Sequence, residues 1–194
     1  AANHAGTTPT ALRHDAGLAA AKVNVFLRQL VEKSGGVATV GCIEFKPNAI
    51  NVIPSKAVFT VDLRNPDKEK LDNDEKILAA YLKDLAKEDD VKISTEHLTE
   101  FDPVPFDEGI VEKVEKAAKA HGLSVRRITS GAGQDAQMIA RICPTAMIFV
   151  PSVKGISHNP EEYTKDEDVL AGAGVFLDVV MDMAVVGVPA ARNN

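Results

Sequence analysis

Apolar residues in the first part of the chain recur at helical spacing. Between residues 15 and 33 they fall three or four positions apart, which places them on one stripe of an amphipathic helix. The following Ser34-Gly35-Gly36 is typical of a helix end, because glycine readily takes the left-handed conformation found there. The pattern predicts one helix over residues 15–33. Its apolar stripe consists of Val23, Phe26, Leu27, Leu30 and Val31.

The pattern then changes to extended segments. Residues 37–45 and 49–54 favour strands, and in residues 57–63 every second side chain is apolar. A two-residue turn at Ser55-Lys56 would join the last two segments into a β-hairpin with one buried face. The side chains on that face would be Ala57, Phe59, Val61 and Leu63.

A second helix and a further extended segment complete this region. Asn65-Pro66 is typical of a helix N-cap followed by proline at the first helical position. Residues 91–98 favour another strand. The helix between them would bury Leu71, Leu78, Tyr81, Leu82 and Leu85. The order predicts an α+β unit, an antiparallel sheet with two helices on one face. Such a sheet usually has one more strand, which would precede Ala1.

A change in composition marks a second region. Prolines and acidic residues in 101–109 indicate a linker, which divides the chain into regions 1–103 and 104–194. The elements expected after it are a helix over 110–120, strand candidates at 123–128 and 145–151, and a helix over about 165–184. The second strand candidate is nearly all apolar, as buried parallel strands are, so this region is α/β in character.

The last helix should bury one apolar side, and a tail should follow it. The expected buried residues are Val169, Leu170, Ala173, Phe176, Leu177, Val180, Met181 and Ala184. Residues 185–194 have the composition of a tail.

Composition narrows the function classes. The 194 residues carry a net charge of -6 and no basic stripe, so nucleic-acid binding is not expected. No apolar run approaches the roughly 20 residues that span a bilayer. Cys42 and Cys143 lie far apart and form no CxxC pattern, which predicts a reducing, cytoplasmic location. The opening residues after Ala1 resemble a turn entered from an upstream segment, so we expect the chain to be a piece of a longer polypeptide.

Two loops of the second region carry candidate chemistry. His158 follows a predicted buried strand, where α/β proteins place their sites, and imidazole is a common metal ligand. The alternative is a loop histidine bonded to its own backbone. The glycine-rich stretch 130–136 would let backbone N–H groups approach an anion or a carbonyl. A tight strand–helix connection, with Asp135 as the cap of the next helix, explains that stretch equally well.

Three polar residues of the first region are further candidates. If Ser55-Lys56 forms a two-residue loop, Asn51 pairs with Thr60, and Asn51 and Arg64 then share the non-core face of the sheet. An arginine there can bind a carboxylate through two parallel hydrogen bonds, and an asparagine can hydrogen-bond to the group beside that carboxylate. A solvated strand face is the alternative. His4 lies in a turn, where a histidine is usually just exposed.

Taken together, these residues resemble the amidase, hydantoinase/carbamoylase family. That family includes N-carbamoyl-L-amino acid hydrolases, allantoate amidohydrolases and β-ureidopropionases, and it belongs to the aminoacylase and carboxypeptidase-like metallopeptidase superfamily. The resemblance spans nearly the whole chain in the family's order. It rests on NHAGTTP (3–9), RHDA (13–16), PNAINVIP (47–54), FTVDLRNPD (59–67), SGAGQDA (130–136) and FVPSVKGISHNPEEYT (149–164).

The resemblance implies a fold and an activity. Residues 1–103 would be the lid, or dimerisation, domain without its first strand, and residues 104–194 would be the C-terminal part of an α/β metallopeptidase-like catalytic domain. The intact enzyme would be a homodimer holding two divalent metal ions, zinc or alternatively manganese, cobalt or nickel. It would hydrolyse the linear amide or ureido bond of a small acid such as an N-carbamoyl amino acid.

The resemblance also implies roles for single residues. His158 matches the last metal ligand of the family, and Asn51 and Arg64 match residues that grip the substrate carboxylate. His4 matches a histidine that one subunit lends to the other to stabilise the oxyanion. The chain departs from the family in carrying Thr10 where methionine is usual.

The glycine stretch matches a backbone contact to substrate through Gly131 or Gly133. Gln134 stands where many relatives have histidine, which bears on substrate preference. One histidine cannot build a dinuclear site, so this chain alone is expected to hold no metal. The alternatives are an inactive dimerisation and substrate-binding fragment, or an aminoacylase or peptidase that cleaves an ordinary amide.

Overall fold

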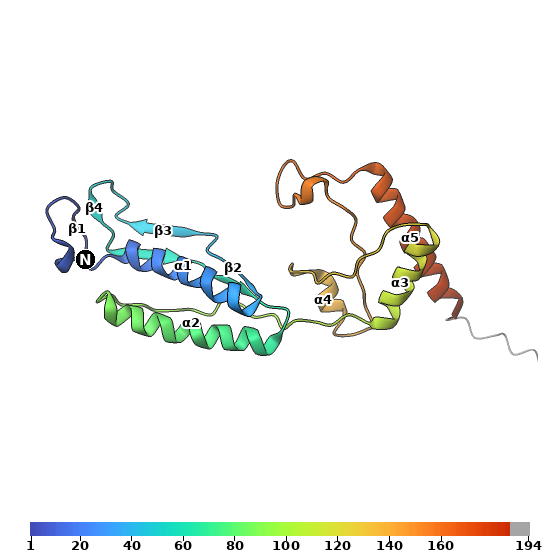
Figure 1. Cartoon of the computed structure of the whole chain (residues 1–194), viewed down its shortest axis with the longest axis horizontal. Coiled ribbons are helices and arrows are strands. Elements are labelled where there is room, and N and C mark those ends of the chain that lie inside the picture. Colours follow the sequence, from blue (N-terminus) through green and yellow to red (C-terminus); the bar gives the residue numbers. More distant parts are fainter. Residues whose placement is uncertain (187–194) are drawn as a thin grey trace, which may run out of the picture. The chain divides into compact units, whose positions relative to one another are not determined.

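The computed structural model describes residues 1–186, which divide into two units (Figure 1). The first unit spans Ala1–Pro103 and the second begins at Val104. The first unit contains helices α1 (Ala16–Ser34) and α2 (Lys68–Glu88), a 3₁₀ turn (Thr10–Leu12), and strands β1 (Asn3–His4), β2 (Val37–Thr39), β3 (Ile43–Lys46), β4 (Val52–Ile53), β5 (Lys56–Phe59) and β6 (Asp62–Arg64).

Helix α1 forms where the apolar period predicts it. Asp15 caps its first turn, because one carboxylate oxygen accepts the amides of Gly17 and Leu18 at 2.8 and 3.1 Å. Gly35 ends it in the left-handed conformation, with φ of 80°. The helix predicted over residues 15–33 is therefore confirmed to within a residue at each end.

The strands form one long antiparallel hairpin with an irregular centre. At one end β2 pairs with β6, with Val37 opposite Arg64, and at the other β3 pairs with β5, with Ile43 opposite Phe59. These registers differ by one residue, which places a bulge near Gly41. The two ends are joined because the Thr60 amide donates to the Cys42 carbonyl at 3.1 Å.

The hairpin differs from the predicted one. Residues 49–54 do not pair with 57–63, because β4 pairs instead with β1 at the start of the chain. The true partner of 56–59 is 43–46, and the connection runs through residues 47–55. The predicted faces do hold for most positions: Ala57, Phe59 and Leu63 are half-buried, whereas Val61 is 37% exposed.

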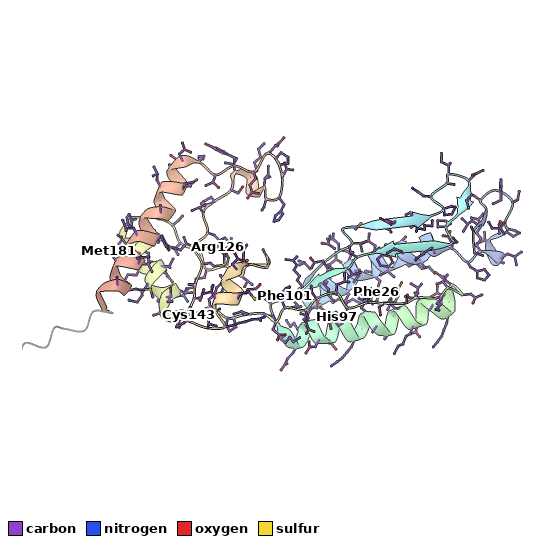
Figure 2. All side chains as sticks on the ribbon, turned by 180° about the vertical axis from the view of Figure 1, so that it is seen from behind. Phe26, His97, Phe101, Arg126, Cys143 and Met181 are labelled. Carbon is purple, nitrogen blue, oxygen red and sulfur yellow. The ribbon has the colours of Figure 1, made fainter. Side chains whose placement is uncertain are left out.

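The core of the first unit lies between the hairpin and the two helices. Its buried centre is Ala19, Val23, Leu27 and Leu85. Around it pack Ala38, Val40, Phe59, Leu78, Tyr81, Leu82, Val91 and Ile93. Phe26 of α1, which is labelled in Figure 2, stacks on Tyr81 of α2 with ring centroids 3.7 Å apart. Helix α1 therefore packs on the hairpin through β2 and β5, and α2 packs on α1. The predicted placement of both helices on one face of a sheet stays a prediction.

Two boundaries in this unit differ from the predictions. Helix α2 is capped by Asp67, which accepts the Lys70 amide at 3.2 Å, and not by Asn65. Asn65 instead forms a turn by accepting the Asp67 amide at 3.1 Å, which delays the helix by two residues. Residues 91–98 form no strand, although Val91 and Ile93 contact the core.

The second unit is built on two packed helices. Its elements are α3 (Glu108–Ala120), α4 (Asp135–Ile139), a 3₁₀ turn (Val153–Gly155) and α5 (Asp166–Val186). An ion pair and a hydrogen bond join α3 and its C-cap to α5. Lys113 pairs with Asp182, and His121 Nε2 lies 2.7 Å from Asp178 Oδ2. The prediction of a helix over 110–120 is confirmed with a start two residues earlier, after the Asp107 cap.

Three predictions for this unit are wrong. Residues 123–128 and 145–151 are not strands, because within residues 1–186 no neighbouring strand takes up their backbone N–H and C=O groups. Helix α5 buries Val175 and Val179, and not the predicted stripe. Leu170, Phe176, Leu177 and Met181 of that stripe are each more than half exposed (Met181 is marked in Figure 2). The tail predicted for 185–194 lies outside the described residues from 187 on.

None of the described helices is long and apolar enough to cross a membrane.

The core assignment predicts a contrast between two leucines of α1. Leu27 is 1% exposed and Leu18 is 52% exposed. Leu27→Ala should lower the free energy of unfolding by about 3 kcal/mol, because it leaves a cavity in the core. Leu18→Ala, the same change on the same helix, should cost under about 1 kcal/mol. Urea unfolding of the chain, followed by circular dichroism, measures both, and equal losses would contradict this core.

Candidate active site

His4 and Asn51 lie beside each other at one end of the first unit. Strand β1 pairs with β4, so that His4 faces Val52 across the two-stranded ribbon. On the next rung the Ala5 amide donates to the Asn51 carbonyl at 2.8 Å. Both residues are exposed. The structure thus brings together two of the residues predicted from the sequence, through a pairing that local pattern does not reveal.

The turn that follows His4 is held by side-chain hydrogen bonds. The His4 carbonyl accepts the Thr8 hydroxyl at 2.7 Å and the Thr8 amide at 3.2 Å. Arg13 donates to the carbonyls of Ala5 and Thr8. Our residue-by-residue interpretation of the sequence gave Arg13 no role, since nothing local links it to the turn before it.

Arg64 lies at the other end of the hairpin and is held by a carboxylate. Its Nε donates to Asp62 Oδ1 at 2.7 Å and its Nη2 donates to Asp62 Oδ2 at 2.5 Å. This bidentate contact lowers the pKa of Asp62 and raises the pKa of Arg64. Sequence reasoning missed Asp62, although alternation along the strand places it on the same face as Arg64.

Helix α1 separates Arg64 from the pair at the ribbon. At its N-terminal end the Ala16 amide donates to the Pro54 carbonyl at 3.2 Å, next to β4. At its C-terminal end Gly36 lies so close to Arg64 that a Cβ there would be 2.6 Å from the Arg64 carbonyl oxygen. The helix has 19 residues and is therefore about 28 Å long. Figure 1 shows β1 and β4 at one end of this unit and β2 near the other.

The expected arrangement of Asn51 and Arg64 is consequently wrong. Asn51 does not pair with Thr60, because Thr60 bonds to Cys42 and Asn51 bonds to Ala5. Arg64 does lie on the exposed, non-core face of the hairpin, as predicted. Within one chain, the two residues cannot contact the same small molecule.

In the second unit, His158 lies on a closed loop. The loop base is fixed because the Val153 amide donates to the Tyr163 carbonyl at 2.8 Å. The His158 amide donates to a Glu162 carboxylate oxygen at 2.8 Å, and its φ of 56° is left-handed. Its side chain is exposed. Among residues 1–186, no group of three or more His, Cys, Asp and Glu side chains is placed to hold a metal ion.

Two glycines of the stretch 130–136 are exposed and have room for a side chain. A Cβ added at Gly131 would meet no atom within 4 Å, and one added at Gly133 would meet only Gln137 Oε1 at 3.8 Å. The short helix α4 that follows is capped by Gln134. Asp135 is its first residue and not its cap, so that prediction is wrong.

These residues supply recognition and hydrogen-bonding chemistry. Arg64 offers a forked cation suited to a carboxylate. His4 and Asn51 offer neutral polar groups at a shared tip, and the Gly131 and Gly133 segment offers exposed backbone. His158 alone cannot form a metal centre, since metal sites that act on amides need several ligands.

Comparisons with known proteins identify the family. The model of peptidase family M20/M25/M40 matches residues 5–182. The N-carbamoyl-L-amino-acid amidohydrolase of Rhizobium meliloti is 40% identical over 183 residues, which cover 93% of this chain and 44% of that protein. The allantoate amidohydrolase of Escherichia coli is 37% identical over 187 residues, covering 94% of this chain and 45% of that protein.

A solved structure agrees. The crystal structure of an amidase of the hydantoinase/carbamoylase family from Burkholderia multivorans superposes with a TM-score of 0.90 at 38% identity, covering 95% of this chain and 45% of the other. The chain spans less than half the length of these relatives. It belongs to peptidase family M20/M25/M40 and is similar to amidohydrolases of the hydantoinase/carbamoylase type.

Proposed function

We propose that this chain provides the lid and the C-terminal part of the catalytic domain of a metal-dependent amidohydrolase. The substrate would be an N-carbamoyl amino acid or a related ureido acid. The relatives act on such compounds by name. The observation that carries the proposal is the half-exposed guanidinium of Arg64, already held in a two-point contact with a carboxylate.

Each residue has a distinct role in this proposal. Arg64 binds the substrate carboxylate and fixes the distance to the scissile bond. His4 donates a hydrogen bond to the oxygen that becomes negative, and Asn51 contacts the substrate beside it. A backbone amide at Gly131 or Gly133 adds a further contact. Hydrolysis of a carbamoyl C–N bond would yield the amino acid, ammonia and carbon dioxide.

The remaining parts are proposed to lie elsewhere in a longer enzyme. His158 would be one ligand of two divalent ions, zinc or alternatively manganese, cobalt or nickel, with the other ligands outside the described residues. The exposed apolar stripe of α5 supports a longer enzyme, since such an apolar face needs a covering element. Cys42 and Cys143 are free and exposed, which suits a cytoplasmic enzyme.

The separation along α1 favours a site shared between two subunits. An amino-acid-sized substrate is far shorter than the helix of 19 residues that separates Arg64 from His4. We therefore propose a homodimer in which His4 and Asn51 of one subunit complete the site that contains Arg64 of the other.

Mixing two impaired variants tests this sharing, with activity measured at a substrate concentration well below the wild-type KM. In the enzyme that contains this chain, His4→Ala should lower kcat about 100-fold or more. Arg64→Ala should raise KM roughly 10- to 100-fold. A dimer with one subunit of each kind has one complete site, so random mixing should restore about a quarter of wild-type activity.

The matched control uses two residues from the same ribbon. A mixture of His4→Ala with Asn51→Ala should restore nothing, because neither subunit has an intact ribbon to lend. Mixed dimers would be verified by differential tagging. Recovery in the control, or its absence with Arg64→Ala in verified mixed dimers, would contradict the shared site.

Metal analysis tests His158. His158→Ala should lower the metal bound per subunit, because a ligand is lost. His97→Ala, another exposed histidine, should leave the metal content unchanged. Elemental analysis of the purified enzyme measures both. Full metal retention in His158→Ala would reduce His158 to a loop residue.

Asp62 should keep Arg64 ready for substrate. Its depressed pKa keeps it ionised above its unfolded value of about 4, and the pair is lost only as pH falls through the lower folded value. Asp62→Asn should therefore raise KM several-fold with kcat unchanged, because Arg64 loses its fixed orientation. Steady-state kinetics at pH 7 measures this. A fall in KM would mean that Asp62 competes with the substrate.

A further inference from the structure

The turn after His4 fixes the imidazole through its inner nitrogen. The Gly6 amide donates to His4 Nδ1 at 3.0 Å. A neutral imidazole has one nitrogen that accepts and one that donates. Because Nδ1 accepts from Gly6, the ring proton lies on Nε2. The ring therefore presents a donor on the side away from the turn.

Gly6 also packs against the ring itself. A Cβ added at Gly6 would lie 3.3 Å from His4 Cε1 and 3.6 Å from Nδ1, so a larger residue must displace the ring by a few tenths of an ångström. Gly6 is not among the glycines with positive φ. Alanine is therefore compatible with its backbone, and the ring contact is what the substitution changes.

Arg13 closes the turn that contains Gly6. Its Nη2 donates to the Ala5 carbonyl at 2.6 Å and its Nε donates to the Thr8 carbonyl at 3.0 Å. One rigid guanidinium thus bridges the residues on the two sides of Gly6. Bonds from a charged donor are stronger than neutral ones, so the arginine holds the turn closed.

The other end of the turn is fixed as well. Thr8, which is 8% exposed, donates to the His4 carbonyl through both its amide and its hydroxyl. The Ala5 amide bonds to Asn51 on the partner strand. The backbone on both sides of His4 is therefore tied down, while its side chain stays exposed.

We propose that Arg13 and Gly6 are positioning residues that hold His4 as a neutral hydrogen-bond donor through Nε2. This inference rests on the proposed role of His4 toward the substrate oxyanion. Neither Arg13 nor Gly6 contacts substrate in it. They act only through the orientation of the imidazole, and a displacement of about 1 Å at a reacting group can cost 100-fold in rate.

A double-mutant cycle in the complete enzyme tests this. Arg13→Lys keeps the charge but cannot bridge two carbonyls in a forked geometry, so kcat should fall about 10-fold while KM changes little. Gly6→Ala should give the same split through the ring contact. In the His4→Ala background, both substitutions should have no further effect on kcat, because the group they position is gone.

Arg28→Lys is the matched control, an exposed arginine on α1 that should be silent in both backgrounds. Thermal unfolding would verify that each variant is folded. If Arg13→Lys and Gly6→Ala lower kcat equally with and without His4, they act on general structure and the inference is wrong. If neither lowers kcat, it is also wrong.

The cycle separates this inference from the proposed function. If His4→Ala itself leaves kcat unchanged, the proposed catalytic role of His4 fails. In that case a long-range ¹H–¹⁵N spectrum of the histidines at about pH 8 still tests the positioning. The Nε2–H form of His4 should dominate in the wild type, and the His4 signals should move in Gly6→Ala but not in Arg28→Lys.

Discussion

The packing of helix α1 against the hairpin is the contact on which the first unit depends. Leu27 and Val23 bury one side of the helix against the inward residues of the strands and against Leu85 of α2. Each end of the same helix contacts a segment that contains candidate site residues. Ala16 bonds to Pro54 beside the His4 ribbon, and Gly36 abuts the Arg64 carbonyl. The helix therefore sets the distance between the two groups of polar residues.

That fixed distance explains why the candidate site residues of the first unit form two separate groups. Arg64 lies on strand β6 and is oriented by its bidentate contact with Asp62. His4 and Asn51 lie on a short ribbon whose geometry comes from hydrogen bonds in turns. A rigid helix cannot bend to bring the two together, so a substrate that needs both requires a second copy of the ribbon.

Sequence patterns predicted the features that depend on interactions between residues close together in the chain. The caps and apolar stripe of α1 depend on residues within one or two turns, and the helix was found to within a residue. The face of Ala57, Phe59 and Leu63 follows from strand alternation alone. The hairpin register could not be found this way. Residues 52–53 pair with residues 3–4, a contact distant in sequence that leaves no local trace.

The same distinction applies to the site residues. The contact of Asp62 with Arg64 could have been predicted, because residues two positions apart on a strand lie on the same face. The contacts of Arg13 could not have been predicted. Its partners are backbone carbonyl groups in a turn, and no side-chain pattern indicates the geometry of that turn. His158 lies on a loop, as predicted, but a metal role depends on ligands from several segments, and within residues 1–186 no group of three or more His, Cys, Asp and Glu side chains is placed to hold a metal ion.

The two units differ in how much of their apolar surface is buried by their own described residues. The first unit buries a continuous core between helices and hairpin. In the second, the described apolar residues that are fully buried are Ala118, Val175 and Val179, and an ion pair and a hydrogen bond at the surface join α3 and its C-cap to α5. Such exposed interactions contribute little free energy. Packing of the apolar stripe of α5 against a covering element would contribute far more.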